Sequence, residues 1–142
     1  LADRRFVYPT FVDEARDLAI LLWDVDGVPA LQFRPVALAR WEWVRGLGYG
    51  YSFAYPTITI HQVSMLDYAP EDSGIYPGTW FSNGFIGGMS GGPIIDATGY
   101  VVGIVQRGTT QIGYGVSVDT ILGFLAEAEV ANVKVTAPSL IM

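Results

Sequence analysis

The sequence predicts an all-β fold, an antiparallel barrel or sandwich closed by one helix. Three observations lead to this prediction. Short segments with the apolar runs or the period-two alternation of strands follow one another, and glycine-rich turn sequences separate them. One segment near the C-terminus has the periodicity of a helix. The regular alternation of strands and helices that a parallel sheet requires is missing.

The predicted strands differ in clarity. Residues 57–63 form the clearest one, because β-branched side chains alternate there with a period of two. Residues 44–53 are predicted to form a kinked strand, since Gly46, Gly48 and Gly50 interrupt the run. The predicted strands occupy residues 5–8, 18–23, 44–53, 57–63, 93–96, 100–106 and 112–118.

The predicted helix runs from Asp119 to Val130. Asp119 is a suitable N-cap, because its side chain can accept a hydrogen bond from a free N–H of the first turn. Its apolar face consists of Ile121, Leu122, Leu125 and Ala128. The remaining tail is β-branched and contains a proline, and its structure is left open.

Composition excludes several classes of protein. The 142 residues fit one domain. The net charge is −6, with scattered basic residues, so we expect no nucleic-acid partner. The longest apolar runs, such as 18–23, are far shorter than the roughly 20 residues of a membrane-spanning helix. The absence of cysteine excludes disulfides and thiol chemistry.

The segment Gly87-Gly88-Met89-Ser90-Gly91-Gly92-Pro93 is the most informative part of the chain. Glycines on both sides of one serine let the backbone approach a ligand closely and adopt positive φ. An acyl-transfer site needs such a backbone, because the hydroxyl must be exposed and N–H groups must converge on the developing oxyanion. Taken alone, the segment fits a glycine-rich hairpin turn better than a catalytic loop.

The residues that follow favour the catalytic interpretation. Gly88-Met89-Ser90-Gly91-Gly92-Pro93, then Gly103-Ile104-Val105, closely resemble the nucleophile region of trypsin-like serine proteases. The similarity continues through Tyr114-Gly115-Val116 into the C-terminal helix. Met89 stands where many members have an aspartate, which resembles the bacterial, heat-shock-type branch. The resemblance implies a double-barrel fold, with a complete C-terminal barrel and a partial N-terminal one.

The resemblance also implies roles for individual residues. Ser90 would be the nucleophile, and the N–H groups of Gly88 and Ser90 would form the oxyanion hole. The substrate backbone would pair along the strand at residues 106–108. The implied substrate-binding residues are Asn83, Gly84, Phe85, Gln106, Arg107, Gly108 and Gly115. None of these is acidic, so an uncharged substrate side chain is expected rather than lysine or arginine.

A serine nucleophile needs a base, and the base needs an acid that orients it. Arg16-Asp17-Leu18-Ala19-Ile20-Leu21-Leu22 is similar to the family segment whose aspartate has this role, so the resemblance makes Asp17 the acid. The family histidine precedes that aspartate, yet none of the 16 residues before Asp17 is a histidine. His61, the one histidine of the chain, is expected to face solvent or to bond locally on its strand.

The missing histidine suggests a truncated chain, as does a first residue that is not methionine. The expected division is a residual N-terminal barrel at residues 1–40, the C-terminal barrel with its helix at 41–130, and a tail at 131–142. The base would lie upstream or on a separate chain. As an isolated chain we expect little or no peptidase activity, because removing one triad member costs several orders of magnitude in rate.

Two other hydrolase interpretations are weaker. Gly88-Met89-Ser90-Gly91-Gly92 matches the nucleophile elbow of α/β-hydrolases, but a strand and no histidine follow it. Trp23-Asp24-Val25-Asp26-Gly27 resembles the first motif of haloacid-dehalogenase-type phosphatases, which use Mg²⁺. Asp-Gly is also a favoured turn dipeptide, and the later motifs of that family are missing.

The main alternative to an enzyme is a catalytically incomplete trypsin-like domain that binds proteins. Trp41 and Trp43 alternate on one strand face and could mark a partner surface, although packing in the core or at the barrel rim is the expected arrangement. The expected function is a serine endopeptidase that acts on peptides or proteins, without cofactor or metal. The family resemblance implies a secreted or periplasmic location, although no targeting segment is visible.

Overall fold

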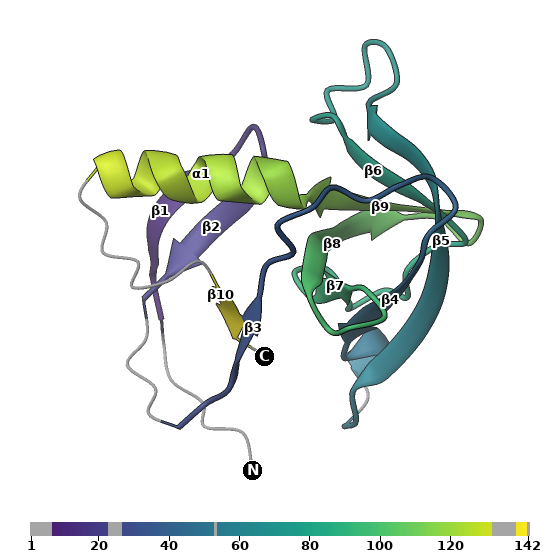
Figure 1. Cartoon of the computed structure of the whole chain (residues 1–142), viewed down its shortest axis with the longest axis horizontal. Coiled ribbons are helices and arrows are strands. Elements are labelled where there is room, and N and C mark those ends of the chain that lie inside the picture. The colour runs from purple at the N-terminus through teal and green to yellow at the C-terminus, as the bar shows by residue number, and fades with distance from the viewer. Residues whose placement is uncertain (1–6, 23–26, 53, 132–138, 142) are drawn as a thin grey trace.

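A computed structural model describes residues 7–22, 27–52, 54–131 and 139–141. Most of the regular structure in these residues is β (Figure 1). The strands are β1 (Pro9–Asp13), β2 (Leu18–Leu21), β3 (Ala30–Gln32), β4 (Trp43–Gly48), β5 (Thr57–Tyr68), β6 (Gly78–Ser82), β7 (Pro93–Ile95), β8 (Val101–Gly108), β9 (Ile112–Ser117) and β10 (Ser139–Ile141). The helix α1 spans Val118–Val130, and one 3-10 turn spans Gly50–Ser52.

Six strands close into an antiparallel barrel in the order β4-β5-β6-β9-β8-β7. The period-two alternation of β5 explains its place there, because Val63 points into the barrel while Ile58 and Ile60 are exposed outside. The barrel core consists of Leu38, Val44, Val63, Phe81, Met89, Ile94, Val102 and Val105. The predicted barrel with one C-terminal helix is therefore confirmed, and the sandwich alternative is excluded.

A second apolar layer lies outside the barrel. β1 and β2 form a separate antiparallel hairpin, and α1 crosses it on the way from β9 (Figure 1). Leu18 from the hairpin and Phe124 from α1 share one buried cluster with Val116, which faces outward from β9. The helix thus fastens the hairpin to the barrel wall.

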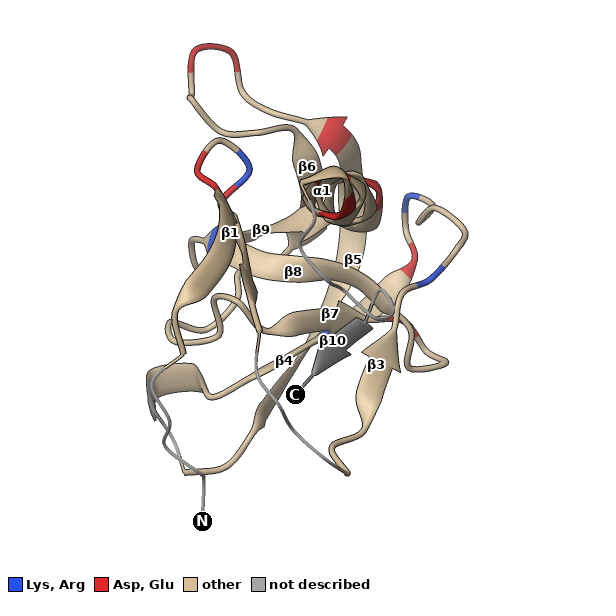
Figure 2. Ribbon diagram, turned by 90° about the vertical axis from the view of Figure 1, so that its left-hand side faces the viewer, with Lys and Arg blue, Asp and Glu red and all other residues tan. Residues whose placement is uncertain are grey.

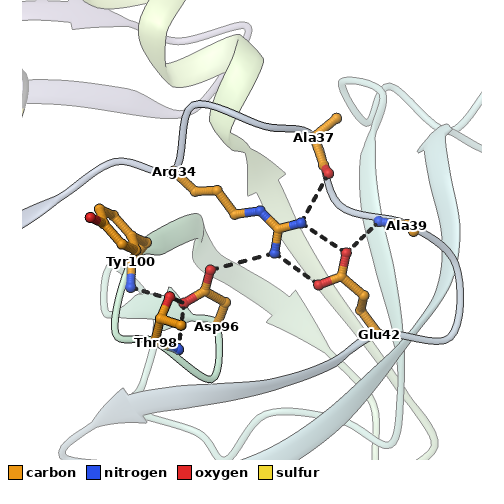
Figure 3. A network of polar contacts seen from close by, with 7 residues as sticks. All are labelled: Arg34, Ala37, Ala39, Glu42, Asp96, Thr98 and Tyr100. Carbon is orange, nitrogen blue, oxygen red and sulfur yellow. Dashed lines mark hydrogen bonds and ion pairs between the residues drawn. The ribbon is translucent and has the colours of Figure 1, made fainter.

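The chain reaches the barrel through the segment between β3 and β4, which an arginine-centred cluster secures (Figure 3). Arg34 pairs with both carboxylate oxygens of Glu42, at 2.8 and 2.9 Å, and lies 3.4 Å from Asp96 at the end of β7. Asp96 in turn accepts hydrogen bonds from Thr98 and from the Tyr100 N–H. We call Arg34, Glu42 and Asp96 the Arg34 cluster.

Several boundaries differ from the predictions. The first strand begins at Pro9, whereas the predicted strand at 5–8 lies partly outside the described residues. Ser117 caps α1 by accepting from the Thr120 N–H, so Asp119 belongs to the first turn and is not the cap. β3, β6 and β10 were not predicted. β10, within the predicted tail, pairs antiparallel with β3.

Charge is unevenly distributed over the surface. Figure 2 shows acidic residues at the β1–β2 turn, in the β5–β6 connection and along α1, toward one end of the molecule. Within the described ranges no helix is long and apolar enough to cross a membrane, and no group of acidic and histidine side chains is suited to hold a metal ion.

Candidate active site

Ser90 lies in a loop, residues 86–92, that the barrel holds firmly. Met89 is buried in the barrel core, and its N–H donates to Ile86 O at 3.1 Å. The Gly91 N–H donates to Val105 O on β8 at 2.8 Å. Ser90 itself is exposed, and its hydroxyl donates to Gln106 O at 3.0 Å. Ser90 is therefore exposed between two residues, Met89 and Gly91, whose backbone N–H groups are hydrogen-bonded.

Gly88 supplies one of the two N–H groups expected to bind an oxyanion. Its φ is +96°, and a Cβ there would lie 2.8 Å from Tyr49 O, so this position requires glycine. The Tyr51 N–H donates to Gly87 O at 2.7 Å. Because the carbonyl and N–H of a trans peptide point in opposite directions, this bond turns the Gly88 N–H away from Tyr51.

The N–H groups of Gly88 and Ser90 have no hydrogen-bond partner among the described residues. Both residues are exposed. Two unpaired N–H donors beside an exposed hydroxyl are the elements of a site that stabilises a tetrahedral oxyanion.

Asp17 lies in the turn of the β1–β2 hairpin, which we call the Asp17 turn (residues 13–17). Its φ is +57°, a conformation in which aspartate and asparagine are enriched, and its N–H donates to Glu14 O at 3.3 Å. Arg16 anchors this turn by donating to both carboxylate oxygens of Glu127 on α1, at 2.9 and 2.7 Å. The hydrogen bond with Glu127 raises the pKa of Arg16, so the guanidinium stays charged.

The Asp17 turn also faces the barrel. The Arg16 guanidinium lies 5.8 Å from the ring centre of Tyr76, whose carbonyl accepts from the Tyr114 hydroxyl on β9. Burial raises the pKa of Tyr114, the charge of Arg107 opposes this, and the charges of Tyr76 and Asp17 add to it. Asp17 is thus within electrostatic range of the β8–β9 pair, although no hydrogen bond joins it to Ser90 in the described structure.

His61 is fully buried inside the barrel and bonds locally, which is the second of the two expected arrangements; it does not face solvent. Its Nδ1 lies 3.3 Å from the carbonyls of Ser82 and Asn83, which only accept, so Nδ1 carries the proton. The Thr59 hydroxyl, 2.6 Å from Nε2, donates to the remaining lone pair. Burial lowers the pKa of His61, against the opposing effect of the two carbonyls. His61 has no lone pair to offer Ser90.

The other expected substrate-binding residues fall into three groups. Residues 83–85, the pocket segment, run from the end of β6 toward Ser90, and the 106–108 end of β8 lies beside them, since a Cβ on Gly108 would come within 3.4 Å of Phe85 N. Arg107 is exposed and donates to Gln106 Oε1 at 3.0 Å. Gly115 is turned away, because its Cβ would meet Ile94 at 2.5 Å inside the barrel.

Sequence reasoning missed two glycines that face Phe85 directly. Cβ atoms on Gly46 and Gly113 would each lie 2.8 Å from the Phe85 ring. The only signal for Gly46 was a glycine within a strand, which indicates close approach by another group.

Two further sequence candidates have different outcomes. Asp24 and Asp26 of the phosphatase-like motif lie outside the described residues. The expectation that Trp41 and Trp43 pack in the core or at the barrel rim is wrong, because the two residues are 62% and 61% exposed.

Comparison with known proteins identifies a family and several proteins of similar fold. The family described as a trypsin-like peptidase domain matches residues 3–104. An inactive-form mutant of Rv3671c from M. tuberculosis H37Rv is similar to the chain with a TM-score of 0.71 and 23% identity, over 91% of this chain and 67% of that one. A variant of the HtrA-type protease AlgW with a decapeptide is similar with a TM-score of 0.76 and 19% identity, over 89% of this chain and 41% of that one.

A serine endoprotease from Yersinia pestis gives a TM-score of 0.69 and 17% identity, over 85% of this chain and 43% of that one. These identities carry information on the fold alone, and the chain spans about two fifths to two thirds of these relatives. No curated protein sequence matches the chain significantly.

Proposed function

Because the chain belongs to the trypsin-like peptidase domain family, a family of serine endopeptidases, we propose that Ser90 is the nucleophile of a peptide-bond hydrolase. One observation carries this proposal: an exposed serine hydroxyl stands beside the unpaired N–H groups of Gly88 and Ser90. The glycine at position 88 and the buried Met89 fix that arrangement before any substrate binds.

The chemistry follows from these groups. Ser90 Oγ attacks the carbonyl carbon of the scissile bond, and a base removes the hydroxyl proton. The carbonyl oxygen becomes an oxyanion that accepts from the N–H groups of Gly88 and Ser90. The protonated base then gives its proton to the departing amine, leaving an acyl group on Ser90. Water, activated by the same base, releases the carboxylic acid and restores the hydroxyl.

No histidine of these 142 residues is placed to act as the base of this mechanism. His61 is the one histidine of the chain, and both of its ring nitrogens are engaged in the barrel interior. We propose that a histidine on an upstream part of the protein, or on a separate chain, meets Asp17 and Ser90. Asp17 would accept its N–H and hold the tautomer that faces Ser90.

Substrates are proposed to be peptides or proteins that carry an uncharged side chain at the cleaved residue. The support is the absence of acidic residues from the pocket segment and from residues 106–108. The family resemblance further supports a secreted or periplasmic location, which fractionation of host cells would test. A finding only in the cytosolic fraction would contradict it.

Labelling with a fluorophosphonate probe tests the proposed nucleophile. The full-length protein should form an adduct whose mass maps to Ser90, and Ser90→Ala should abolish it. Ser73→Ala, which changes an exposed serine of the β5–β6 connection, is the matched control. The 142-residue chain alone should react several orders of magnitude more slowly, since it lacks the base. A full-length protein that resists the probe would rule out the proposal.

A further inference from the structure

We infer that His61 is a positioning residue that holds Phe85 in the substrate side-chain pocket, so that the pocket admits only a small, uncharged side chain. The inference rests on the proposed function, because it concerns the pocket beside Ser90. It assigns a purpose to a buried histidine that the proposed catalytic step does not use.

His61 hydrogen-bonds to the backbone where the pocket segment leaves β6. Its Nδ1–H is shared between the carbonyls of Ser82 and Asn83, both at 3.3 Å. From the other side, the Asn83 amide donates to Ile60 O on β5 at 3.1 Å, and Asn83 has a φ of +51°. The bend at Asn83 is therefore tied to β5 by two side chains, His61 from β5 and Asn83 itself.

The same imidazole supports the Phe85 ring. The two ring centres are 4.2 Å apart with an angle of 42° between the planes. Phe81 closes the group from the core side, with its ring centre 5.6 Å from that of Phe85. Because His61 is buried and hydrogen-bonded at both nitrogens, the surface that it offers Phe85 is rigid.

The Phe85 ring fills the space between strands that are not neighbours in the barrel. A Cβ on Gly46 of β4 would lie 2.8 Å from Cε1 of the ring, and one on Gly113 of β9 would lie 2.8 Å from Cε2. Both edges of the ring thus abut a glycine backbone. The volume that these glycines leave open is occupied by the protein's own side chain.

The two walls of the pocket also touch each other. The Gly84 N–H donates to Thr110 O at 3.4 Å, and a Cβ on Gly84 would lie only 1.4 Å from Thr109 O. The pocket segment and the turn after β8 therefore meet backbone to backbone. With the interior filled by Phe85 and the walls in contact, a large substrate side chain has no place, so we expect the pocket to accept a methyl-sized one at most.

The size of side chain that the pocket accepts can be measured with two peptidyl boronates. They differ only in the residue next to boron, which is alanine in one and phenylalanine in the other. Their competition with the fluorophosphonate probe at Ser90 of the full-length protein gives a selectivity ratio. We expect the alanine compound to bind at least about tenfold more tightly, and Phe85→Ala to reduce the ratio by at least about tenfold. Phe85→Leu, which keeps most of the volume, should leave an intermediate ratio.

The role of His61 is tested by a pair of substitutions. His61→Phe keeps a ring but removes the N–H that holds the pocket segment, so the ratio should fall at least about threefold. His61→Asn places an amide N–H near the position of Nδ1 and should restore most of the selectivity. A purely structural histidine would lower the melting temperature in both variants without changing the ratio, and that result would overturn the inference.

Failure of the inference and failure of the proposed function give different results. Probe labelling with equal affinity for both boronates would overturn the inference alone. Absence of labelling would overturn the proposed function. In that case the inference is tested by NMR, by titrating N-acetylphenylalaninamide, a small mimic of a phenylalanine substrate residue, into the native protein and into Phe85→Ala. Shifts at Gly108 and Gly113 in Phe85→Ala, but not in the native protein, support an occupied pocket, whereas no binding to either protein overturns it.

Discussion

The two side chains proposed for catalysis lie in regions that different forces hold. The loop with Ser90 is part of a closed barrel, where backbone hydrogen bonds such as Gly91 N–H to Val105 O fix it and Met89 anchors it in the core. The Asp17 turn lies at the tip of a two-stranded sheet. Its polar link to the rest of the molecule is the ion pair of Arg16 with Glu127 on α1, beside the apolar packing of Leu18.

The two halves of the proposed site are therefore held in place by different interactions. The hydroxyl and the oxyanion donors are preorganised by geometry, which depends little on the solvent. The acid is placed by a hairpin that apolar packing of Leu18 against α1 secures, and by an ion pair that salt weakens. Ser90 should therefore keep its geometry under conditions that move Asp17.

The largest expected effect is the loss of Asp17. Asp17→Asn in the full-length protein should lower kcat by about 10⁴-fold, because asparagine cannot hold the base in the correct tautomer. Asparagine tolerates the φ of +57°, so the melting temperature should not change. Peptidase assays and thermal unfolding measure the two quantities. Glu14→Gln, in the same turn, is the control, and an equal loss in both variants would argue against a catalytic Asp17.

The oxyanion donors offer a test with a matched pair of glycines. Gly88→Ala places a methyl group at a φ of +96° and 2.8 Å from Tyr49 O, which should displace the donor and slow labelling of Ser90 by about 10²- to 10³-fold. A Cβ on Gly87 meets no atom within 4 Å, so Gly87→Ala should label at nearly the native rate. Equal rates for the two variants would show that the Gly88 N–H does not bind the oxyanion.

The same contrast explains what the sequence predicted well. Patterns among neighbouring residues predicted the strand at 57–63, the helix that ends at Val130 and the glycine-rich loop around Ser90, because each of these depends on residues close together in the chain. β3 escaped prediction because its partner, β10, lies more than a hundred residues away in sequence. Pairing at that distance leaves no local periodicity.

The site was predicted in part for the same reason. The glycines on both sides of Ser90 predicted that the backbone there can approach a ligand closely. The burial of His61 was not visible, since an inward and an outward position differ by one residue of strand register. The contact of Gly46 and Gly113 with Phe85 joins three separate segments, and only the closed barrel brings them together.

The Arg34 cluster extends the comparison to stability. Burial alone would raise the pKa of Asp96, but hydrogen bonds from Thr98 and Tyr100 and the charge of Arg34 outweigh it and lower the pKa. Asp96→Asn should therefore reduce the free energy of unfolding by about 2 kcal/mol at pH 7.

Because the folded-state pKa of Asp96 is lowered, its contribution is present above the ordinary aspartate pKa, near 4, and is lost as pH falls through the folded value. Denaturant unfolding of native protein and variant between about pH 7 and pH 3 should show the difference shrinking. Asp72→Asn, on the exposed β5–β6 connection, should show no such trend. A constant difference would mean that the carboxylate charge is not what stabilises the turn.

The smallest effect is expected at Arg16. Arg16→Gln removes the pair with Glu127, an exposed carboxylate, and should lower the melting temperature slightly at about 0.02 M salt and not measurably at about 1 M. Glu127→Gln should behave alike, and Glu129→Gln, on the same helix, should change nothing. In the full-length protein, Arg16→Gln should also slow Ser90 labelling only at low salt. A loss that persists at 1 M would mean that Arg16 holds the turn by packing on Tyr76, and the acid would then be placed by geometry, as the nucleophile is.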